Sequence, residues 1–171
     1  MTQIMLGLGS NIERERYLIA GLDALQGLFG ELALSPVYDC PSIGYQGPAF
    51  LNMVVAADTS LDIGELARRI RHIEVEHGRP PNATRSTPRQ LDIDILSYGD
   101  VVGTVGSVEL PRGEILENAF VLRPLADLAP QLRHPVDGRS YRELWEAYDQ
   151  ASQPLVRVDF SWRGRLISRA E

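Results

Sequence analysis

The sequence predicts an α+β fold of the ferredoxin-like type, a βαββαβ sandwich with an additional helix and strand at its C-terminal end. Two observations lead to this prediction. Strand-like and helix-like apolar patterns follow one another in the order β-α-β-β-α-β over residues 4–100, and a further helical pattern and a further strand pattern come after them. We therefore expect one sheet rich in antiparallel pairs, with helices packed mainly on one of its faces.

The first half of the chain supplies the first strand, the first helix and the two strands that follow. Residues 4–9 form a short apolar run that ends in glycine, as a strand would. Over residues 11–29, apolar side chains recur at helical spacing, and Gly30 suits the end of that helix. Residues 32–39 and 50–59 are rich in strand-forming residues.

The second helix is predicted over residues 60–78. Ser60 is a residue type that caps helices, and Gly78 is typical of a helix end. Between them a single apolar stripe carries Ile63, Leu66, Ile70 and Ile73.

The remaining elements follow in the second half. We predict a strand over residues 90–100, short helices over residues 120–128 and 140–150, and a last strand over residues 155–162. The segments 39–50, 78–89 and 102–118 are irregular, and long irregular connections within a domain are often functional. The basic end, residues 161–171, is predicted to be a frayed tail.

Composition narrows the function classes. The length of 171 residues fits one domain over residues 1–171, and the net charge of −6 argues against a general nucleic-acid binder. We see no apolar run long enough for a membrane span and no signal peptide. The lone Cys40 fits a reducing, cytoplasmic setting. We expect a cytoplasmic protein with small-molecule substrates, no nucleic-acid or membrane partner, and a monomeric or dimeric state.

Asp92 and Asp94 occupy alternate positions in the predicted strand 90–100. Leu91, Ile93 and Ile95 should point into the core, which leaves the two carboxylates on the other face with Cα atoms roughly 6–7 Å apart. One interpretation is the solvent-facing half of an ordinary strand. The other is a magnesium site, because Mg²⁺ takes one or two protein carboxylates and completes its shell with water and phosphate oxygens.

Three arginines favour the second interpretation. Arg79, Arg85 and Arg89 lie in the segment that leads into this strand. Guanidinium groups match phosphate geometry, and phosphoryl or pyrophosphoryl transfer depends on positioning and charge neutralisation. The sequence has no Gly-x-x-x-x-Gly-Lys loop, so the chain is not a P-loop enzyme.

The segment "RSTPRQLDIDIL", residues 85–96, resembles the signature of the hydroxymethyldihydropterin pyrophosphokinase family, R-x-G-P-R-x-x-D-[LIV]-D-[ILV]-[LIVM]. Other family motifs are matched in order along most of the chain, at "GLGSNI" (7–12), "YDCPSIGYQGPAFLN" (38–52), "IEVEHGR" (73–79) and "FVLRPLADLAPQLRHPVDG" (120–138).

The resemblance implies a reaction and a set of site residues. Members of the family transfer pyrophosphate from ATP to the hydroxymethyl group of 6-hydroxymethyl-7,8-dihydropterin and release AMP. By this likeness Asp92 and Asp94 bind two Mg²⁺ ions together with ATP. The nucleotide side would use Glu74, and Arg79, Arg85 and Arg89 would act on the triphosphate as catalytic residues alongside the aspartate pair.

The same resemblance implies the pterin pocket. Two phenylalanines would stack on the pterin, an asparagine would read its amide-like edge, and backbone groups near the irregular segment 39–50 would assist. From the residues alone, a phenylalanine is more often a core residue and an asparagine a turn or edge residue. The implied pterin residues are Cys40, Ile43, Gly44, Phe50, Asn52 and Phe120.

The sequence departs from the family pattern mainly over residues 110–120. Arg112 and Asn118 stand where the family usually has a histidine and an arginine. We hypothesise that Arg112 restores the lost positive charge as a nucleotide-binding residue, and that Arg123 contributes too. Two alternatives to the usual activity stay open: a pyrophosphokinase for another pterin or donor, and a catalytically silent pterin-binding protein.

Overall fold

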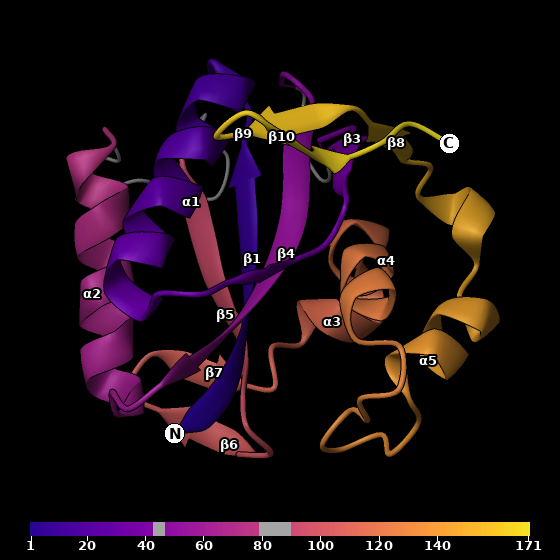
Figure 1. Cartoon of the computed structure of the whole chain (residues 1–171). Helices are drawn as coiled ribbons and strands as arrows, with labels where there is room; N and C mark the ends of the chain where they lie inside the picture. The colour runs from indigo at the N-terminus through magenta and orange to yellow at the C-terminus, as the bar shows by residue number, and fades with distance from the viewer. Residues whose placement is uncertain (43–46, 79–89) are drawn as a thin grey trace.

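A computed structural model of the chain describes residues 1–42, 47–78 and 90–171. The strands of its main sheet run in the order β5-β1-β4-β3-β8, with the short β2 beside β4, and every pair is antiparallel (Figure 1). Because α1 and α2 make the two crossovers, this is the predicted ferredoxin-like arrangement. The strands are β1 (Thr2–Ser10), β2 (Ala33–Leu34), β3 (Val37–Cys40), β4 (Phe50–Thr59), β5 (Asp92–Tyr98) and β8 (Val156–Val158).

Helices cover both faces of the sheet (Figure 1), and the prediction that they pack mainly on one face was wrong. The two crossover helices lie on one face and the three later helices on the other. The physical reason is that the central strands carry apolar side chains on both sides, as strands buried on both faces do. The helices are α1 (Arg14–Phe29), α2 (Ile63–Glu76), α3 (Glu114–Glu117), α4 (Ala119–Leu128) and α5 (Tyr141–Ala147).

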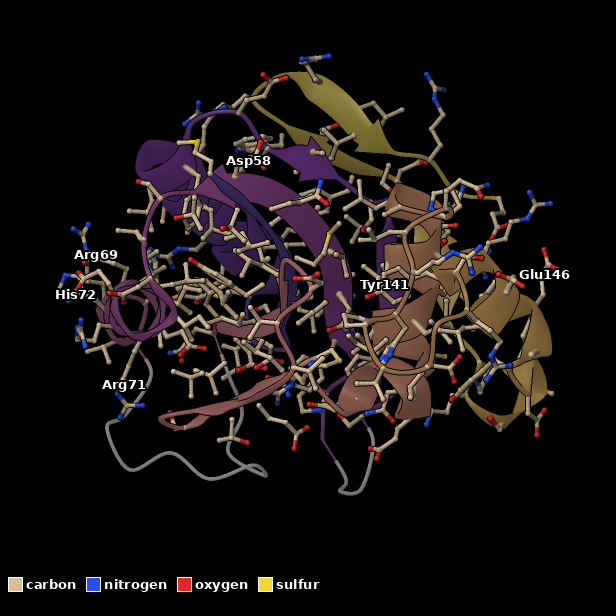
Figure 2. All side chains as sticks on the ribbon, turned by 90° about the horizontal axis from the view of Figure 1, so that it is seen from below. Asp58, Arg69, Arg71, His72, Tyr141 and Glu146 are labelled. Carbon is tan, nitrogen blue, oxygen red and sulfur yellow. The ribbon has the colours of Figure 1, made fainter. Side chains whose placement is uncertain are left out.

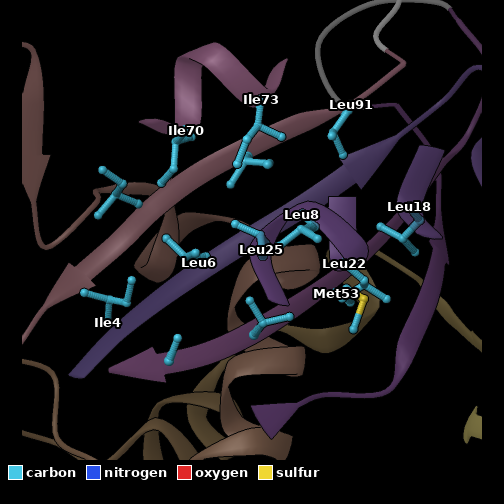
Figure 3. Packing of buried hydrophobic residues seen from close by; sticks show 14 of the residues in the cluster. Ile4, Leu6, Leu8, Leu18, Leu22, Leu25, Met53, Ile70, Ile73 and Leu91 are labelled. Atoms are coloured by element: carbon cyan, nitrogen blue, oxygen red, sulfur yellow. The ribbon is translucent and has the colours of Figure 1, made fainter. Parts of the chain in front are cut away.

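The first core lies between the sheet and the two crossover helices. In Figure 3, Ile70 and Ile73 of α2 and the leucines of α1 converge on one face of β1 and β5. The alternation of each strand selects which residues take part. Fully or almost fully buried members of this core are Ile4, Leu6, Leu8, Leu18, Leu22, Leu25, Met53, Leu66 and Leu91.

The second core lies on the opposite face of the same strands. Met5, Val54 and Leu96 come from β1, β4 and β5, and α4 and α5 cover them. Figure 2 shows Tyr141 of α5 directed into this core, whereas Glu146 of the same helix points outward. In the same view Arg69 and His72 point away from the sheet on the outer side of α2.

Several element boundaries differ from the prediction. The α2 helix is capped by Asp62, not Ser60, because the Asp62 carboxylate accepts a hydrogen bond of 2.8 Å from the Glu65 backbone N–H. Gly78 has a φ of +93°, which suits glycine just beyond a helix. The irregular segment 102–118 contains a hairpin of β6 (Gly103–Val105) and β7 (Val108–Leu110), followed by α3.

The C-terminal end is ordered structure, so the prediction of a frayed tail was wrong. The predicted strand 155–162 divides into β8 and β9 (Phe160–Trp162), and β9 pairs with β10 (Arg165–Ser168). A 3-10 turn, η1 (Gln150–Ser152), precedes them. The Ser168 hydroxyl donates to the Val158 carbonyl at 2.6 Å and accepts from the Val37 backbone N–H at 2.9 Å, which attaches this hairpin to the sheet edge.

None of the helices in the described part of the chain is both long and apolar enough to cross a membrane.

Candidate functional site

One end of the sheet, on the face that α4 covers elsewhere, carries polar side chains and glycines in place of a core. Gly9 of β1 lies between two strands: its register partners are Asn52 in β4 and Asp92 in β5. Two residues further back, Gly7 is the partner of Asp94. Alternation therefore sets the asparagine and the two aspartates on the same face, around a floor of two glycines.

The absence of a side chain at Gly9 leaves room for the Asn52 side chain. A Cβ atom at Gly9 would lie 2.7 Å from the Asn52 Oδ1 atom, so any other residue there would displace the Asn52 amide. Asn52 is almost fully buried, and its amide lies over the backbone of β1. Gly7 and Gly9 were not predicted as site residues, although their spacing of two within the first strand was a usable signal.

The aspartate pair of β5 has the predicted orientation. Leu91, Ile93 and Ile95 are buried in the first core, and both aspartates face the other side. Burial, together with the negative charge of Asp92, raises the pKa of Asp94 well above its ordinary value. Two carboxylates that repel each other in this way make a site that a cation would stabilise.

Arg112 is held beside Asp94 by a β-bulge. The β1–β5 register shifts so that Leu6 pairs with Ile95 and Met5 with Ser97, and Leu96 has no partner in β1. The Leu96 carbonyl instead accepts a hydrogen bond of 2.9 Å from the backbone N–H of Arg112. The Arg112 Nη2 atom consequently lies 3.6 Å from the Asp94 Oδ1 atom.

Glu114 is a candidate site residue that was not predicted from the sequence. Its Oε1 atom accepts from Arg112 Nε at 2.8 Å and lies 2.6 Å from Arg112 Nη2. Its Oε2 atom accepts from Asn118 Nδ2 at 3.1 Å, and the Asn118 Oδ1 atom accepts from Gln153 Nε2 at 3.1 Å. A chain of polar contacts thus holds the Arg112 guanidinium in place. Its partner Glu114 is the first residue of α3, two positions after Arg112.

Glu74 of α2 supports the aspartate pair from behind. This carboxylate is 6% exposed, and its Oε2 atom accepts a hydrogen bond of 2.8 Å from the backbone N–H of Ile93. Ile93 is the residue between Asp92 and Asp94, on the edge strand of the sheet. Glu74 therefore accepts a hydrogen bond from a backbone N–H on the outer edge of β5, at the residue between the two aspartates.

A cleft of about 380 Å³ opens beside this edge, between α2 and the β6–β7 hairpin. Side chains of both charges line this cleft. The acidic ones are Asp94 and Glu74, and the basic ones are Arg112 and two arginines of α2. The hairpin forms the opposite wall, where Glu109 accepts a hydrogen bond of 2.8 Å from the Gly113 backbone N–H. The two α2 arginines are Arg68 and Arg71, and Val108 of the hairpin also lines the cleft.

The predicted pterin residues that the structure describes lie at the β3–β4 end of the same face and on α4. Cys40 and Phe50 are register partners at the end of the β3–β4 ladder. Burial raises the pKa of the Cys40 thiol to about 12, so this cysteine stays a neutral thiol. Phe120, half-buried in the first turn of α4, packs against the second core. Ile43 and Gly44 lie outside the described residues.

The arginine predictions divide into three groups. Arg79, Arg85 and Arg89 lie outside the described residues, and Arg112 lies next to Asp94. Arg123 lies elsewhere: its guanidinium is 4.9 Å from the centre of the Tyr38 ring and 2.5 Å from a Glu171 oxygen. Arg123 is therefore paired on the α4 side of β3, away from Asp94. This position does not support the hypothesis that Arg123 contributes to nucleotide binding.

The donor set fits magnesium better than a metal held by protein alone. Within residues 1–42, 47–78 and 90–171, no three His, Cys, Asp or Glu side chains gather into a group that could hold an ion. Two neighbouring carboxylates that repel each other fit Mg²⁺. This ion completes its coordination shell with water and phosphate oxygens.

Comparison with known proteins gives consistent matches. The family model described as 7,8-dihydro-6-hydroxymethylpterin-pyrophosphokinase matches residues 5–130. The "2-amino-4-hydroxy-6-hydroxymethyldihydropteridine pyrophosphokinase" of Pseudomonas aeruginosa is 40% identical over 149 residues, which cover 85% of this chain and 91% of that protein. The protein of the same name from Aquifex aeolicus is 32% identical over 145 residues, covering 84% and 90%.

A solved structure shows the same fold. The crystal structure of Plasmodium falciparum HPPK-DHPS wild type with pteroate matches with a TM-score of 0.74 at 14% identity. The match covers 98% of this chain and 47% of the Plasmodium chain, so the present chain spans about half the length of that protein.

Proposed function

The chain belongs to the 7,8-dihydro-6-hydroxymethylpterin-pyrophosphokinase family, and from this premise we propose that the β5 carboxylate pair and the adjoining cleft are its active site. The protein is an ATP-dependent diphosphotransferase that transfers pyrophosphate from ATP to the hydroxymethyl group of 6-hydroxymethyl-7,8-dihydropterin, giving AMP and the pterin diphosphate.

A single relationship carries the assignment of the site. Gly9 has Asn52 as its partner on one side and Asp92 on the other. Neighbouring strands lie about 4.8 Å apart, so the pterin-reading asparagine and the first carboxylate are roughly 10 Å apart across one strand. That separation suits a pterin whose hydroxymethyl group must meet a metal-bound triphosphate.

On the metal side, Asp92 and Asp94 would hold two Mg²⁺ ions with ATP. The bound ions would neutralise phosphate charge. The chain's contribution is to present both carboxylates in one orientation, which the Glu74 contact with the Ile93 backbone supports.

On the nucleotide side, ATP would enter the cleft between α2 and the β6–β7 hairpin. Arg112 would meet a phosphate beside Asp94, and Arg68 and Arg71 would add positive charge along the α2 wall. Arg79, Arg85 and Arg89 remain proposed phosphate-binding residues on the strength of the family signature.

On the pterin side, Asn52 would read the amide-like edge with its donor and acceptor. Phe50 and Phe120 would stack on the ring, and backbone groups near Cys40, Ile43 and Gly44 would complete the pocket. The buried position of Asn52 beside Gly9 supports this role, because packing around an amide helps to hold it in one orientation.

We further infer that residues 1–171 act as one domain in a cytoplasmic setting. Cys40 is buried and free, which suits a reducing compartment.

The test is an assay of AMP release from ATP with 6-hydroxymethyl-7,8-dihydropterin and Mg²⁺. We expect turnover in the wild type and its loss in Asp94→Asn. Asp58→Asn, an exposed aspartate at the far end of β4, is the matched control and should keep full turnover.

A second candidate, a silent pterin-binding protein, is favoured by two observations. Arg112 is already paired with Glu114, and Asn118 stands where the family usually has arginine. Pterin binding by the wild type with no nucleotide binding in the presence of Mg²⁺ would establish that reading and overturn the proposed active site.

A further inference from the structure

We infer that Arg14 is a positioning residue for the pterin side of the site. The inference rests on the proposed function, because it takes Phe50 and Asn52 as pterin-binding residues. Arg14 is the first residue of α1 and lies far from both aspartates in the sequence. Neither the family signature nor the β5 site calls for it.

The Arg14 guanidinium joins two separate stretches of chain. Its Nη1 and Nη2 atoms donate to the two oxygens of Asp39 at 2.9 and 3.1 Å, a two-pronged geometry. Nη1 also donates to the backbone carbonyl of Ala49 at 3.3 Å. Arginine is the side chain whose rigid fork can hold a carboxylate and a carbonyl together.

These two stretches are the ends of β3 and β4. The ladder between them stops at the pair Cys40 and Phe50, immediately beside Asp39 and Ala49. Strand ends loosen where a ladder stops, because their last backbone groups lose partners. A single side chain that binds both ends at this point restrains the spacing of the strands, and with it the positions of Phe50 and Asn52.

Arg14 acts from the opposite side of the sheet from the pterin. Alternation places Asp39 on the α1 face, whereas Asn52 and its partner Tyr38 lie on the α4 face. Arg14 therefore does not contact the substrate in this arrangement. A second link, from the Ser42 hydroxyl to the Pro48 carbonyl at 2.7 Å, connects the same two stretches from within.

The effect on global stability should be small. The Arg14 and Asp39 side chains are 32% and 36% exposed to solvent. Ion pairs this exposed contribute little to the free energy of unfolding. Loss of the fork should instead appear as weaker pterin binding. This separates a positioning role from a purely structural one.

The experiment is calorimetric titration of 6-hydroxymethylpterin into the wild type, Arg14→Ala, Arg14→Lys, Asp39→Asn and the double variant Arg14→Ala/Asp39→Asn. A non-hydrolysable ATP analogue with Mg²⁺ is titrated into each, and thermal unfolding is recorded. Arg142→Ala, which removes an exposed arginine paired with Glu146 on α5, is the matched control.

We expect Arg14→Ala to raise the pterin Kd about tenfold, with Arg14→Lys close to it because lysine has no fork, and the Kd of the ATP analogue unchanged. Asp39→Asn should have a smaller effect and should add nothing in the double variant. An unchanged pterin Kd in Arg14→Ala, or a parallel loss of pterin binding, nucleotide binding and thermal stability, would overturn the inference alone. A wild type that binds no pterin would overturn the proposed function, and the inference with it.

Discussion

Glu74 and Ile93 are joined by a hydrogen bond of 2.8 Å between a buried carboxylate of α2 and the backbone of the edge strand β5. This bond reaches the one residue that separates Asp92 from Asp94. It ties the helix that lines the proposed nucleotide cleft to the strand that presents the two carboxylates.

Glu74→Ala should therefore lower both stability and turnover. The variant leaves the Ile93 N–H without its acceptor, which costs about 1–3 kcal/mol of unfolding free energy. Turnover should fall further than stability explains, because the aspartate pair loses its support. Urea unfolding and AMP release measure the two effects. Glu76→Ala, an exposed glutamate on the same helix, should change neither, and equal losses in both variants would contradict the role given to Glu74.

Asp94→Asn should stabilise the metal-free protein at alkaline pH while abolishing turnover. Burial and the Asp92 charge raise the pKa of Asp94 to about 8 in the folded chain. The unfolded chain releases this proton near pH 4, so wild-type stability falls as pH rises from about 4 to about 8. Above that range Asp94→Asn should be more stable than the wild type by on the order of 2 kcal/mol.

The measurement for Asp94 is urea unfolding with a metal chelator at several pH values between 4 and 9. The wild type and the Asp58→Asn control should share one slope, and Asp94→Asn should lose it. If Asp94→Asn kept the wild-type slope, the two carboxylates would not be in conflict, and the electrostatic argument for a cation would fail.

Glu114→Gln should weaken the use of ATP. The change removes the charge that holds the Arg112 guanidinium in its present position, and the freed guanidinium can then pair more closely with Asp94. We expect kcat/KM for ATP to fall about tenfold, with the pterin Kd unchanged. Steady-state kinetics with each substrate varied separates the two. Glu117→Gln, at an exposed position in α3, is the control, and an equal fall in that variant would argue against Glu114.

His134 should make the fold sensitive to mild acid. Its Nδ1 atom accepts backbone hydrogen bonds from Val136 at 3.1 Å and Asp137 at 3.0 Å, which requires an unprotonated Nδ1. Burial lowers the pKa of His134 in the folded chain, whereas the unfolded chain takes up the proton near pH 6.5. Stability should therefore be full above about pH 6.5 and fall as the pH drops below it.

Urea unfolding at pH 7, 6 and 5 tests this dependence. His134→Ala should be less stable at pH 7 and should show a shallower decline. Asp137, whose pKa is held at about 2 by its hydrogen bond with Arg139, stays charged throughout this range and adds no slope. Replacing the exposed His72 of α2 should leave the decline intact, and a decline that survives in His134→Ala instead would assign it to other groups.

Local sequence patterns predict much of this fold. The strand 50–59 has the bounds of β4, and the alternation at residues 91–95 places the apolar and acidic side chains as expected. These features depend on a period of two within one segment. The second core was also signalled, since Met5 and Val54 sit in runs that are apolar at nearly every position, the pattern of a strand buried on both faces.

Other features depend on distant segments and have no local signal. Arg112 reaches Asp94 only because Leu96 bulges from β5 and offers its carbonyl to another stretch of chain. The end of the chain reads as polar and basic, yet Trp162 and Phe160 bury their rings in the first core. A residue-by-residue reading cannot foresee either contact, because each is decided by packing between segments.

The attachment of Ser168 to Val37 has a consequence for biosynthesis. The outer edge of β3 is completed by residues more than one hundred positions downstream, so it stays open while the ribosome makes everything between them. An unpaired edge invites association with other chains. The newly made polypeptide thus has β3 exposed until β8 is synthesised, and early termination before residue 156 should direct it toward aggregates and proteolysis.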